Sequence, residues 1–388
     1  MAALGPHASA LASVNAAAVR DAEVISAGPT EIVVTCVTDP GLSLATLIGE
    51  HEIVTSGPNH VARVEGLTAD TDYAIAVEGH PGGDPHLPSI VRTLPVPPGR
   101  LRATVATVND VHFGEIECGR VDGLMEEELG PILRAEPGEP PYPHTMNAAA
   151  IAEIDALHPD AIVVKGDLTC RGTHDEYEQF LAAYGALGPA MRHVRGNHDA
   201  MLDPTMAIEG APFAIELDGV TLVVLDTVQP GSDRGQLTKE QTRFLADVAG
   251  STSDPVLVFG HHHIWNLDAD RRSAQYFGIN PDDSERLADV VASHENIAGY
   301  FAGHTHRHRV RRFARMRHVP CVEIGCTKDY PGTWAEYRIY DGGYTQTVHR
   351  MATPAALSWS ERTRPMFAGL YRDYALGGLD ERCFTYLF

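Results

Sequence analysis

Short apolar runs alternate along most of the chain with segments whose apolar residues recur at helical spacing. The apolar runs, which are typical of buried strands, occur at residues 102–109, 161–164, 256–259 and 297–302. Helical patterns lie between them at residues 147–158, 173–187, 238–250 and 283–295. Because strands and helices alternate, this part of the chain is predicted to form an α/β domain.

Local signals define where several of these elements begin. Thr173 and Glu176 have the spacing of a capping box, and Thr238 with Gln241 repeats it. The Asp218-Gly219 pair lies between two apolar segments, 213–217 and 220–225, and predicts a hairpin turn.

The first hundred residues have a different pattern. Residues 1–20 show no clear periodicity and are interpreted as an arm. Strand-like runs follow at 31–38, 43–48, 60–64 and 73–77, separated by turn residues. The proline-rich segment 95–99 is typical of a stiff linker. We therefore expect an arm (1–20), an all-β domain (21–98), the α/β domain (99–350) and a C-terminal tail (351–388).

Composition restricts the kind of partner. The chain has 388 residues and a formal net charge of −22, which disfavours binding to nucleic acid or to anionic lipid. No apolar stretch is long enough to span a membrane. The N-terminus lacks the basic and apolar regions of a secretory signal, so a cytoplasmic location is expected, although a trimmed signal would leave the same sequence.

Polar side chains of one chemical kind follow the predicted strands. They are carboxylates, an amide and imidazoles, which are ligands that small divalent metals prefer. The motifs are Asp110-Val-His112, Gly166-Asp167, Gly196-Asn-His-Asp199, Gly260-His-His262 and Gly303-His-Thr-His306. Alone, the Asp110 and Gly166-Asp167 motifs are weak, because an aspartate or histidine in a loop is usually solvated, whereas the 196–199 motif and the paired histidines are more specific. Together, at the carboxyl ends of successive strands, they predict a metal site.

In type and order these motifs resemble those of the calcineurin-like metallophosphoesterases, over residues 103 to about 310. The resemblance implies that Asp110, His112 and His306 hold one metal, that Asn197, His261 and His304 hold a second, and that Asp167 bridges the two. His262 is the alternative to His261. The expected cofactors are two divalent or mixed-valence ions of iron, manganese or zinc.

The resemblance also implies a mechanism. Two metals about 3.5–4 Å apart clamp a phosphoryl group and activate a bridging hydroxide for attack. His198 would protonate the leaving group. In related protein phosphatases an aspartate in the second motif helps to orient this histidine. Cys170 occupies that place here, so Asp199 is one candidate for the orienting role.

Arg171 and Arg195 are candidates for contacting the phosphate, although each is more often a structural ion-pair residue. The fold implied by the family is a four-layer α/β/β/α sandwich. The preceding β-domain resembles a fibronectin type III domain, as in purple acid phosphatases, with Tyr73 at the corner where a tyrosine hydroxyl bonds nearby backbone. Because Cys170 also replaces the iron-binding tyrosine of those enzymes, a coloured iron–tyrosinate is not expected.

Three functions remain open from the sequence. The first is hydrolysis of phosphodiesters such as cyclic nucleotides, which the 196–199 and 303–306 motifs favour. The second is hydrolysis of phosphomonoesters, including phosphoproteins, and the third is a non-catalytic scaffold. The expected partner is a small phosphate ester. The aromatic tail after residue 351 is expected to pack on the catalytic domain, to shape the substrate entrance or to form a homodimer contact.

Overall fold

The computed structural model describes residues 19–120, 129–208 and 211–388. Most of the arm expected at residues 1–20 lies outside the described residues. Arg20 is the first residue of a strand instead. Within the described residues, no helix is both long and apolar enough to cross a lipid bilayer.

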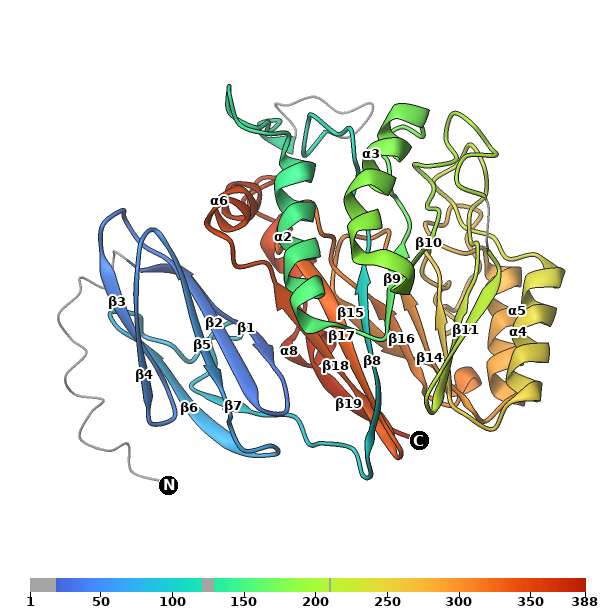
Figure 1. The fold of residues 1–388 in the computed structure, drawn as a ribbon, viewed down its shortest axis with the longest axis horizontal. Coiled ribbons are helices and arrows are strands. Elements are labelled where there is room, and N and C mark those ends of the chain that lie inside the picture. The colour runs from blue at the N-terminus through green and yellow to red at the C-terminus, as the bar shows by residue number, and fades with distance from the viewer. Residues whose placement is uncertain (1–18, 121–128, 209–210) are drawn as a thin grey trace.

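The N-terminal part contains two small antiparallel sheets, shown in blue in Figure 1. One has the strand order β1 (Arg20–Ala27), β2 (Glu31–Val37), β5 (Asn59–Glu65). The other has the order β4 (His51–Ser56), β3 (Ser43–Ile48), β6 (Asp72–Val77), β7 (Ile90–Arg92). Ile32, Leu44 and Ile75 belong to one apolar cluster that joins the two sheets. The hydrogen bond expected at Tyr73 is present, since the Thr68 amide donates to its hydroxyl over 2.8 Å.

Two six-stranded sheets form the rest of the framework. The first has the order β10 (Met191–Val194), β9 (Ala161–Lys165), β8 (Leu101–Val108), β17 (Thr333–Tyr340), β18 (Gly343–Arg350), β19 (Phe384–Leu387). The second has the order β11 (Phe213–Leu217), β12 (Val220–Val224), β13 (Val256–Phe259), β14 (Ile297–Ala302), β16 (Pro320–Glu323), β15 (Arg309–Arg312). The predicted mixed α/β fold is confirmed.

The sheets contact each other through one buried cluster, which includes Val105 and Tyr337 from the first sheet and Leu257 and Phe301 from the second. Helices cover their other faces (Figure 1). On the first sheet lie α2 (Tyr142–Leu157), α3 (His174–Tyr184) and α6 (Pro354–Thr363). On the second lie α4 (Lys239–Ser251) and α5 (Pro281–Ser293). The capping box at Thr173 and the cap at Thr238 are both present.

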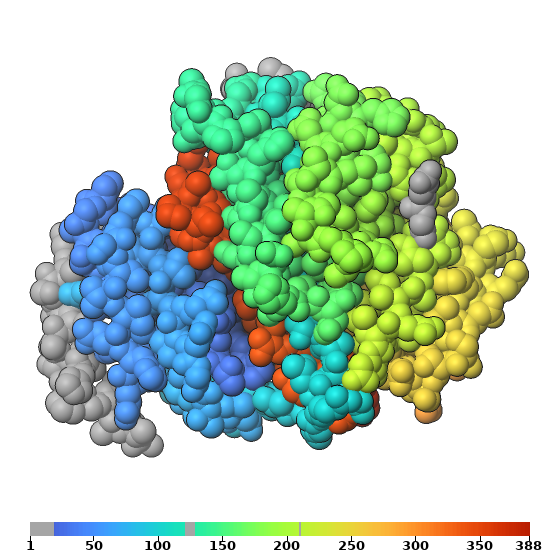
Figure 2. Space-filling view, viewed as in Figure 1, coloured from blue at the N-terminus to red at the C-terminus, as the bar shows by residue number. Residues whose placement is uncertain are grey.

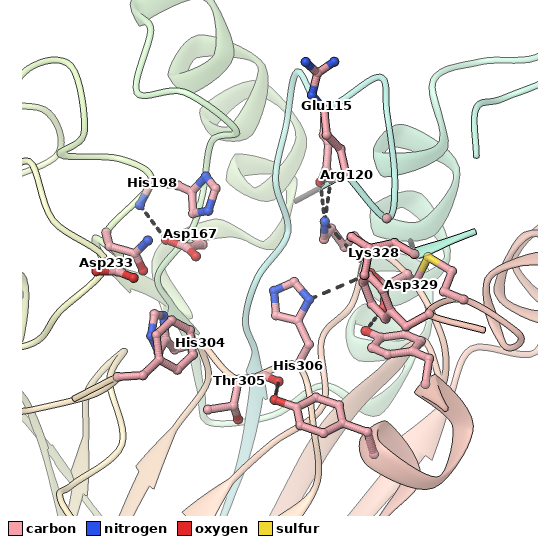
Figure 3. A pocket seen from close by; sticks show the side chains of 18 of the residues that line it. Glu115, Arg120, Asp167, His198, Asp233, His304, Thr305, His306, Lys328 and Asp329 are labelled. Atoms are coloured by element: carbon pink, nitrogen blue, oxygen red, sulfur yellow. Dashed lines mark hydrogen bonds and ion pairs between the residues drawn. The ribbon is translucent and has the colours of Figure 1, made fainter. Parts of the chain in front are cut away.

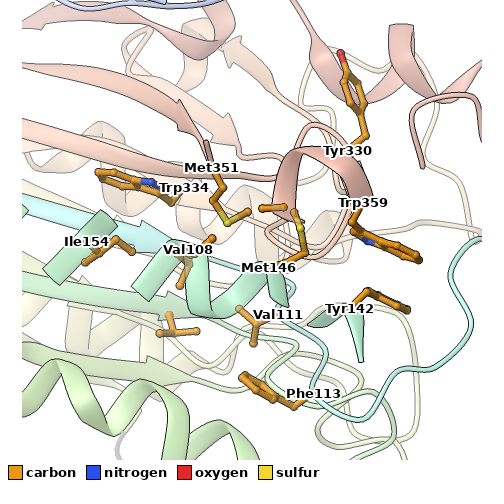
Figure 4. Close-up of a cluster of buried hydrophobic side chains, with 14 of the residues drawn as sticks. Val108, Val111, Phe113, Tyr142, Met146, Ile154, Tyr330, Trp334, Met351 and Trp359 are labelled. Carbon is orange, nitrogen blue, oxygen red and sulfur yellow. The ribbon is translucent and has the colours of Figure 1, made fainter. Parts of the chain in front are cut away.

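The C-terminal tail is part of the core. The Trp359 ring of α6 stacks on the Tyr142 ring of α2 with centroids 4.2 Å apart, within the cluster drawn in Figure 4. Two short helices follow, α7 (Tyr371–Leu376) and α8 (Leu379–Arg382), and β19 then completes the edge of the first sheet. In Figure 2 the N-terminal part, in blue, lies against this orange-red tail.

Strand direction determines where the motifs meet. Strands β8, β9 and β10 run parallel in the first sheet, and β12, β13 and β14 run parallel in the second. The predicted ligands follow the carboxyl ends of β8, β9, β10, β13 and β14. Parallel strands end at a common edge, so five separated loops are brought to one place.

Candidate metal centre

The residues predicted for the first metal lie together. One ligand atom each from Asp110, His112 and His306 falls within 4.8 Å of the others. The Asp110 carboxylate is fixed through Oδ2, which accepts hydrogen bonds from Asn109 Nδ2 at 2.6 Å and from the His304 amide at 2.9 Å. Its other oxygen, Oδ1, faces His306 Nε2 at 3.4 Å.

The residues predicted for the second metal also converge. His261 Nδ1 contacts the Lys165 carbonyl oxygen at 2.8 Å, and this contact fixes the ring so that Nε2 lies 3.1 Å from Asn197 Oδ1. One ring nitrogen of His304 lies within 4.8 Å of a ring nitrogen of His261. His262, the alternative, belongs to that group too, but its Nδ1 contacts Thr227 Oγ1 at 2.9 Å. The contacts with Asn197 and Asp167 are made by His261.

Asp167 lies between the two groups. Its Oδ2 atom is 3.2 Å from His261 Nε2 and 3.6 Å from His112 Nε2. Its Oδ1 atom accepts a hydrogen bond from the His198 amide at 2.9 Å (Figure 3). One carboxylate oxygen therefore faces both candidate sites, which is the position that a bridging ligand requires.

Backbone conformation sets these loops apart from ordinary turns. Positive φ angles occur at predicted ligands, namely Asp110, His112, Asp167, His304 and His306. Such angles are costly for non-glycine residues and tend to occur at functional sites. The glycines in the motifs permit close approach of the loops: a Cβ atom on Gly196 would lie 2.2 Å from the Asp167 amide nitrogen, and one on Gly303 would lie 2.7 Å from Asp110 Oδ2.

The chemistry of these groups fits metal ions. Burial lowers the pKa of His112 and of His304 well below the usual value, which favours the neutral imidazole that binds metals. Burial acts in the same direction at His261, but the Asp167 carboxylate raises the pKa of that imidazole to about 9. Buried atoms without a hydrogen-bond partner among the described residues include Asp110 Oδ1, both His112 ring nitrogens and His304 Nε2. Buried polar atoms of this kind are rare unless they bind something.

His198 is held in a way that the sequence did not reveal. Its Nδ1 lies 2.7 Å from the Cys170 carbonyl oxygen, so the backbone of Cys170 orients the ring. Asp199, the expected orienting residue, has a different role, and that prediction is wrong. Its carboxylate accepts hydrogen bonds from Leu168 N, Thr169 N, Thr169 Oγ1 and Gly196 N, and therefore fixes the loop that carries Asp167.

The two arginines proposed to contact phosphate do not reach the site. Arg195 is buried, and its guanidinium pairs with Asp226 at 2.9 Å and donates to the Pro204 carbonyl oxygen. Arg171 is exposed and is not among the residues that line the cavity described below. Both predictions are corrected: Arg195 ties two loops together, and Arg171 lies outside the cavity lining.

A cavity of about 560 Å³ opens beside the candidate metal centre (Figure 3). Asp167, Asn197, His198, His304 and His306 form part of its lining. The polar remainder of the lining comprises Glu115, Arg120, Lys328 and Asp329, which lie across the cavity from Asp233 (Figure 3). The apolar remainder comprises Phe277 and the tail residues Met366, Phe367, Leu370, Tyr371 and Tyr374.

Several cavity residues were missed by the sequence analysis. Lys328 Nζ lies 2.5 Å from a Glu115 carboxylate oxygen; burial opposes its charge, but Glu115 raises the pKa of the amine well above its usual value. Asp329 Oδ2 is 3.8 Å from His306 Nδ1, and Tyr371 donates to Asp329 Oδ1. No spacing signal marks these residues, because they come from a loop and a tail outside the motifs.

The fold and this convergent group of carboxylates and imidazoles define a metal-dependent hydrolase of phosphoric esters. The calcineurin-like phosphoesterase family model matches residues 103–308, and the chain belongs to that family. The matched region covers every predicted ligand and His198.

Named relatives are similar over parts of the chain. A probable cyclic nucleotide phosphodiesterase of Synechococcus sp. is 25% identical over 214 residues, covering 53% of this chain and 82% of that protein. A probable glycerophosphodiester phosphodiesterase of Arcobacter nitrofigilis is 28% identical over 159 residues, covering 38% of this chain and 57% of the relative. Among solved structures, a purple acid phosphatase from yellow lupin aligns with a TM-score of 0.44 and 12% identity, over 86% of this chain and 72% of its own.

Proposed function

We propose that the protein is a dimetal phosphodiesterase that hydrolyses small phosphodiesters, with cyclic nucleotides among the candidate substrates. Asp110, His112 and His306 would hold one ion of iron, manganese or zinc. Asn197, His261 and His304 would hold the other, with Asp167 between them. The contacts of Asp167 Oδ2 with both His112 and His261 support this arrangement.

A pair of such ions, when bound, polarises the phosphoryl oxygens and lowers the pKa of water. The chain itself supplies the proton donor. His198 lines the cavity and contacts the Cys170 carbonyl through Nδ1, so its Nε2 is the atom available to a substrate. A proton on Nε2 would pass to the departing ester oxygen, and the carbonyl would stabilise the charged ring before transfer.

Cationic side chains that line the cavity are already paired with carboxylates, and this observation favours diesters over monoesters. Lys328 is ion-paired with Glu115, and Arg120 pairs with Glu117 at 2.6 Å. Asp233 and Asp329 add negative charge. A phosphomonoester carries nearly two negative charges at neutral pH and needs more cationic contacts than a diester, which carries one. With Arg195 paired to Asp226 and Arg171 absent from the lining, the cavity suits the diester better.

The experiment compares bis(p-nitrophenyl) phosphate with p-nitrophenyl phosphate after reconstitution with Mn²⁺, because the two share a leaving group. We expect kcat/KM for the diester to exceed that for the monoester by about tenfold or more. Hydrolysis of cyclic AMP and of glycerophosphodiesters is then measured to test these compounds as natural substrates. A preference for the monoester would overturn the proposal and favour a phosphomonoesterase.

A further inference from the structure

The apolar residues of the cavity lining, Phe277 and the tail residues 366–374, are together called the apolar wall, and three of them are unusually exposed to water. Leu370 is 71% exposed, Phe277 49% and Tyr374 44%, although each is large and apolar or aromatic. Met366, which is buried, and Phe367, which is half-buried, also line the cavity. Exposed apolar side chains that gather in a concave site commonly mark the place where a ligand binds.

This apolar wall is tied to the candidate metal centre. The Phe277 ring lies 4.0 Å from the His304 ring, centroid to centroid. The Tyr374 hydroxyl donates to the Thr305 carbonyl oxygen at 2.8 Å, between two predicted ligands. Tyr371 donates to Asp329, which faces His306 (Figure 3). A phosphoryl group at the metal centre would therefore place one of its ester groups near the wall.

We infer that this wall, formed by Phe277 and by the tail residues 366–374, binds the organic group of the ester that is retained during hydrolysis. The substrates are then phosphodiesters in which that group is aromatic or apolar. The inference rests on the proposed diesterase function and specifies its substrate class. The cavity, at about 560 Å³, has room for a phosphodiester with an aromatic ring.

The test uses two diesters with the same leaving group, phenyl p-nitrophenyl phosphate and methyl p-nitrophenyl phosphate. They differ only in the retained ester group. The change in the ratio of their kcat/KM values between the parent protein and a wall variant therefore measures what the wall contributes. We expect the phenyl ester to be preferred by about tenfold or more, since burial of one apolar group in a pocket discriminates by roughly 10–200-fold.

Leu370→Ala is expected to reduce this preference by about fivefold, and Phe277→Ala by a similar factor. Leu387→Ala is the matched control, because Leu387 is 58% exposed on β19 and does not line the cavity. It should leave the ratio unchanged. Calorimetric titration with diphenyl phosphate supplies a second readout, with the dissociation constant rising in Leu370→Ala but not in the control.

The measurements distinguish failure of the proposed diesterase function from failure of the proposed role of the wall. If the parent protein hydrolyses neither diester, the proposed function fails. If it hydrolyses both but the ratio and the affinity for diphenyl phosphate are the same in Leu370→Ala, Phe277→Ala and Leu387→Ala, the diesterase function stands and the role of the wall is overturned.

Discussion

Glu23 and Arg364 form a two-point ion pair that joins the N-terminal strands to the C-terminal tail. Both guanidinium NH groups of Arg364, which follows α6, contact the Glu23 carboxylate of β1, at 2.7 and 2.8 Å. Both side chains are buried, and Arg350 adds a further contact at 3.3 Å. Since the tail also forms a wall of the cavity, the N-terminal part supports the element that shapes the candidate site.

Glu23→Gln should destabilise the protein strongly. It removes one of the two carboxylates that pair with the buried Arg364 and Arg350 and leaves them with Glu361 alone. Breaking a buried pair in this way costs about 3–5 kcal/mol. Urea denaturation at pH 7 measures the change in the free energy of unfolding. Glu65→Gln is the control, because Glu65 is largely exposed in its pair with Arg63 and should cost under about 1 kcal/mol. Equal effects of the two substitutions would contradict a central role for the buried pair.

The same carboxylate predicts a pH dependence. Burial by itself would raise the pKa of Glu23, but Arg364, Arg350 and Arg372 lower it from 4.5 to about 2. A lowered folded-state pKa stabilises the protein above the unfolded-state value, and the effect is lost as the pH falls from about 4.5 towards 2. The stability gap between the parent and Glu23→Gln should therefore narrow over this range. A gap that stays constant from pH 7 to pH 3 would argue against the assignment.

Gly196→Ala should impair metal binding. A Cβ atom there would lie 2.2 Å from the amide nitrogen and from Oδ1 of Asp167, so one loop must move away from the other. We expect the dissociation constant for Mn²⁺ to rise by about tenfold or more, as when the support of a ligand is disturbed. Gly185→Ala is the control, since nothing lies within 4 Å of its Cβ position. Unchanged Mn²⁺ affinity in a folded Gly196→Ala protein would count against the site.

His198→Ala tests the proton donor. The variant should keep its metals but lose about 10²–10⁴-fold in kcat for diesters with poor leaving groups. The loss should be smaller for p-nitrophenyl esters, because that leaving group needs little protonation. His174→Ala, at an exposed histidine on α3, should leave both rates unchanged. If His198→Ala lost the same factor with every leaving group, the histidine would bind phosphate rather than donate a proton.

Local patterns were sufficient for much of the α/β part. The strands at 256–259 and 297–302 have the predicted bounds, and the caps at Thr173 and Thr238 are present, because each depends on residues close in sequence. Packing of the tail on the catalytic domain was one of three expectations, but its helices and β19 were not predicted. Their partners, such as Tyr142 for Trp359, lie more than two hundred residues away.

In the candidate site, too, features set by local motifs could be predicted, whereas features set by distant contacts could not. Motif spacing identified the residues that converge, since ligands must follow strand ends. It misassigned Arg195 and Asp199, whose side chains are occupied by Asp226 and by backbone amides of the 166–169 loop. It also missed Lys328 and Asp329. Contacts between distant loops decide these roles, and a single sequence contains no periodic signal for them.

The most direct test of the dimetal diesterase is a titration of metal-free protein with Mn²⁺. Bound metal and hydrolysis of bis(p-nitrophenyl) phosphate are measured on the same samples. We predict two ions bound per chain, with full activity reached only when both are present, and loss of both metal and activity in Asp167→Ala. Full hydrolysis without metal or with one ion per chain, or two ions retained by Asp167→Ala, would contradict the account.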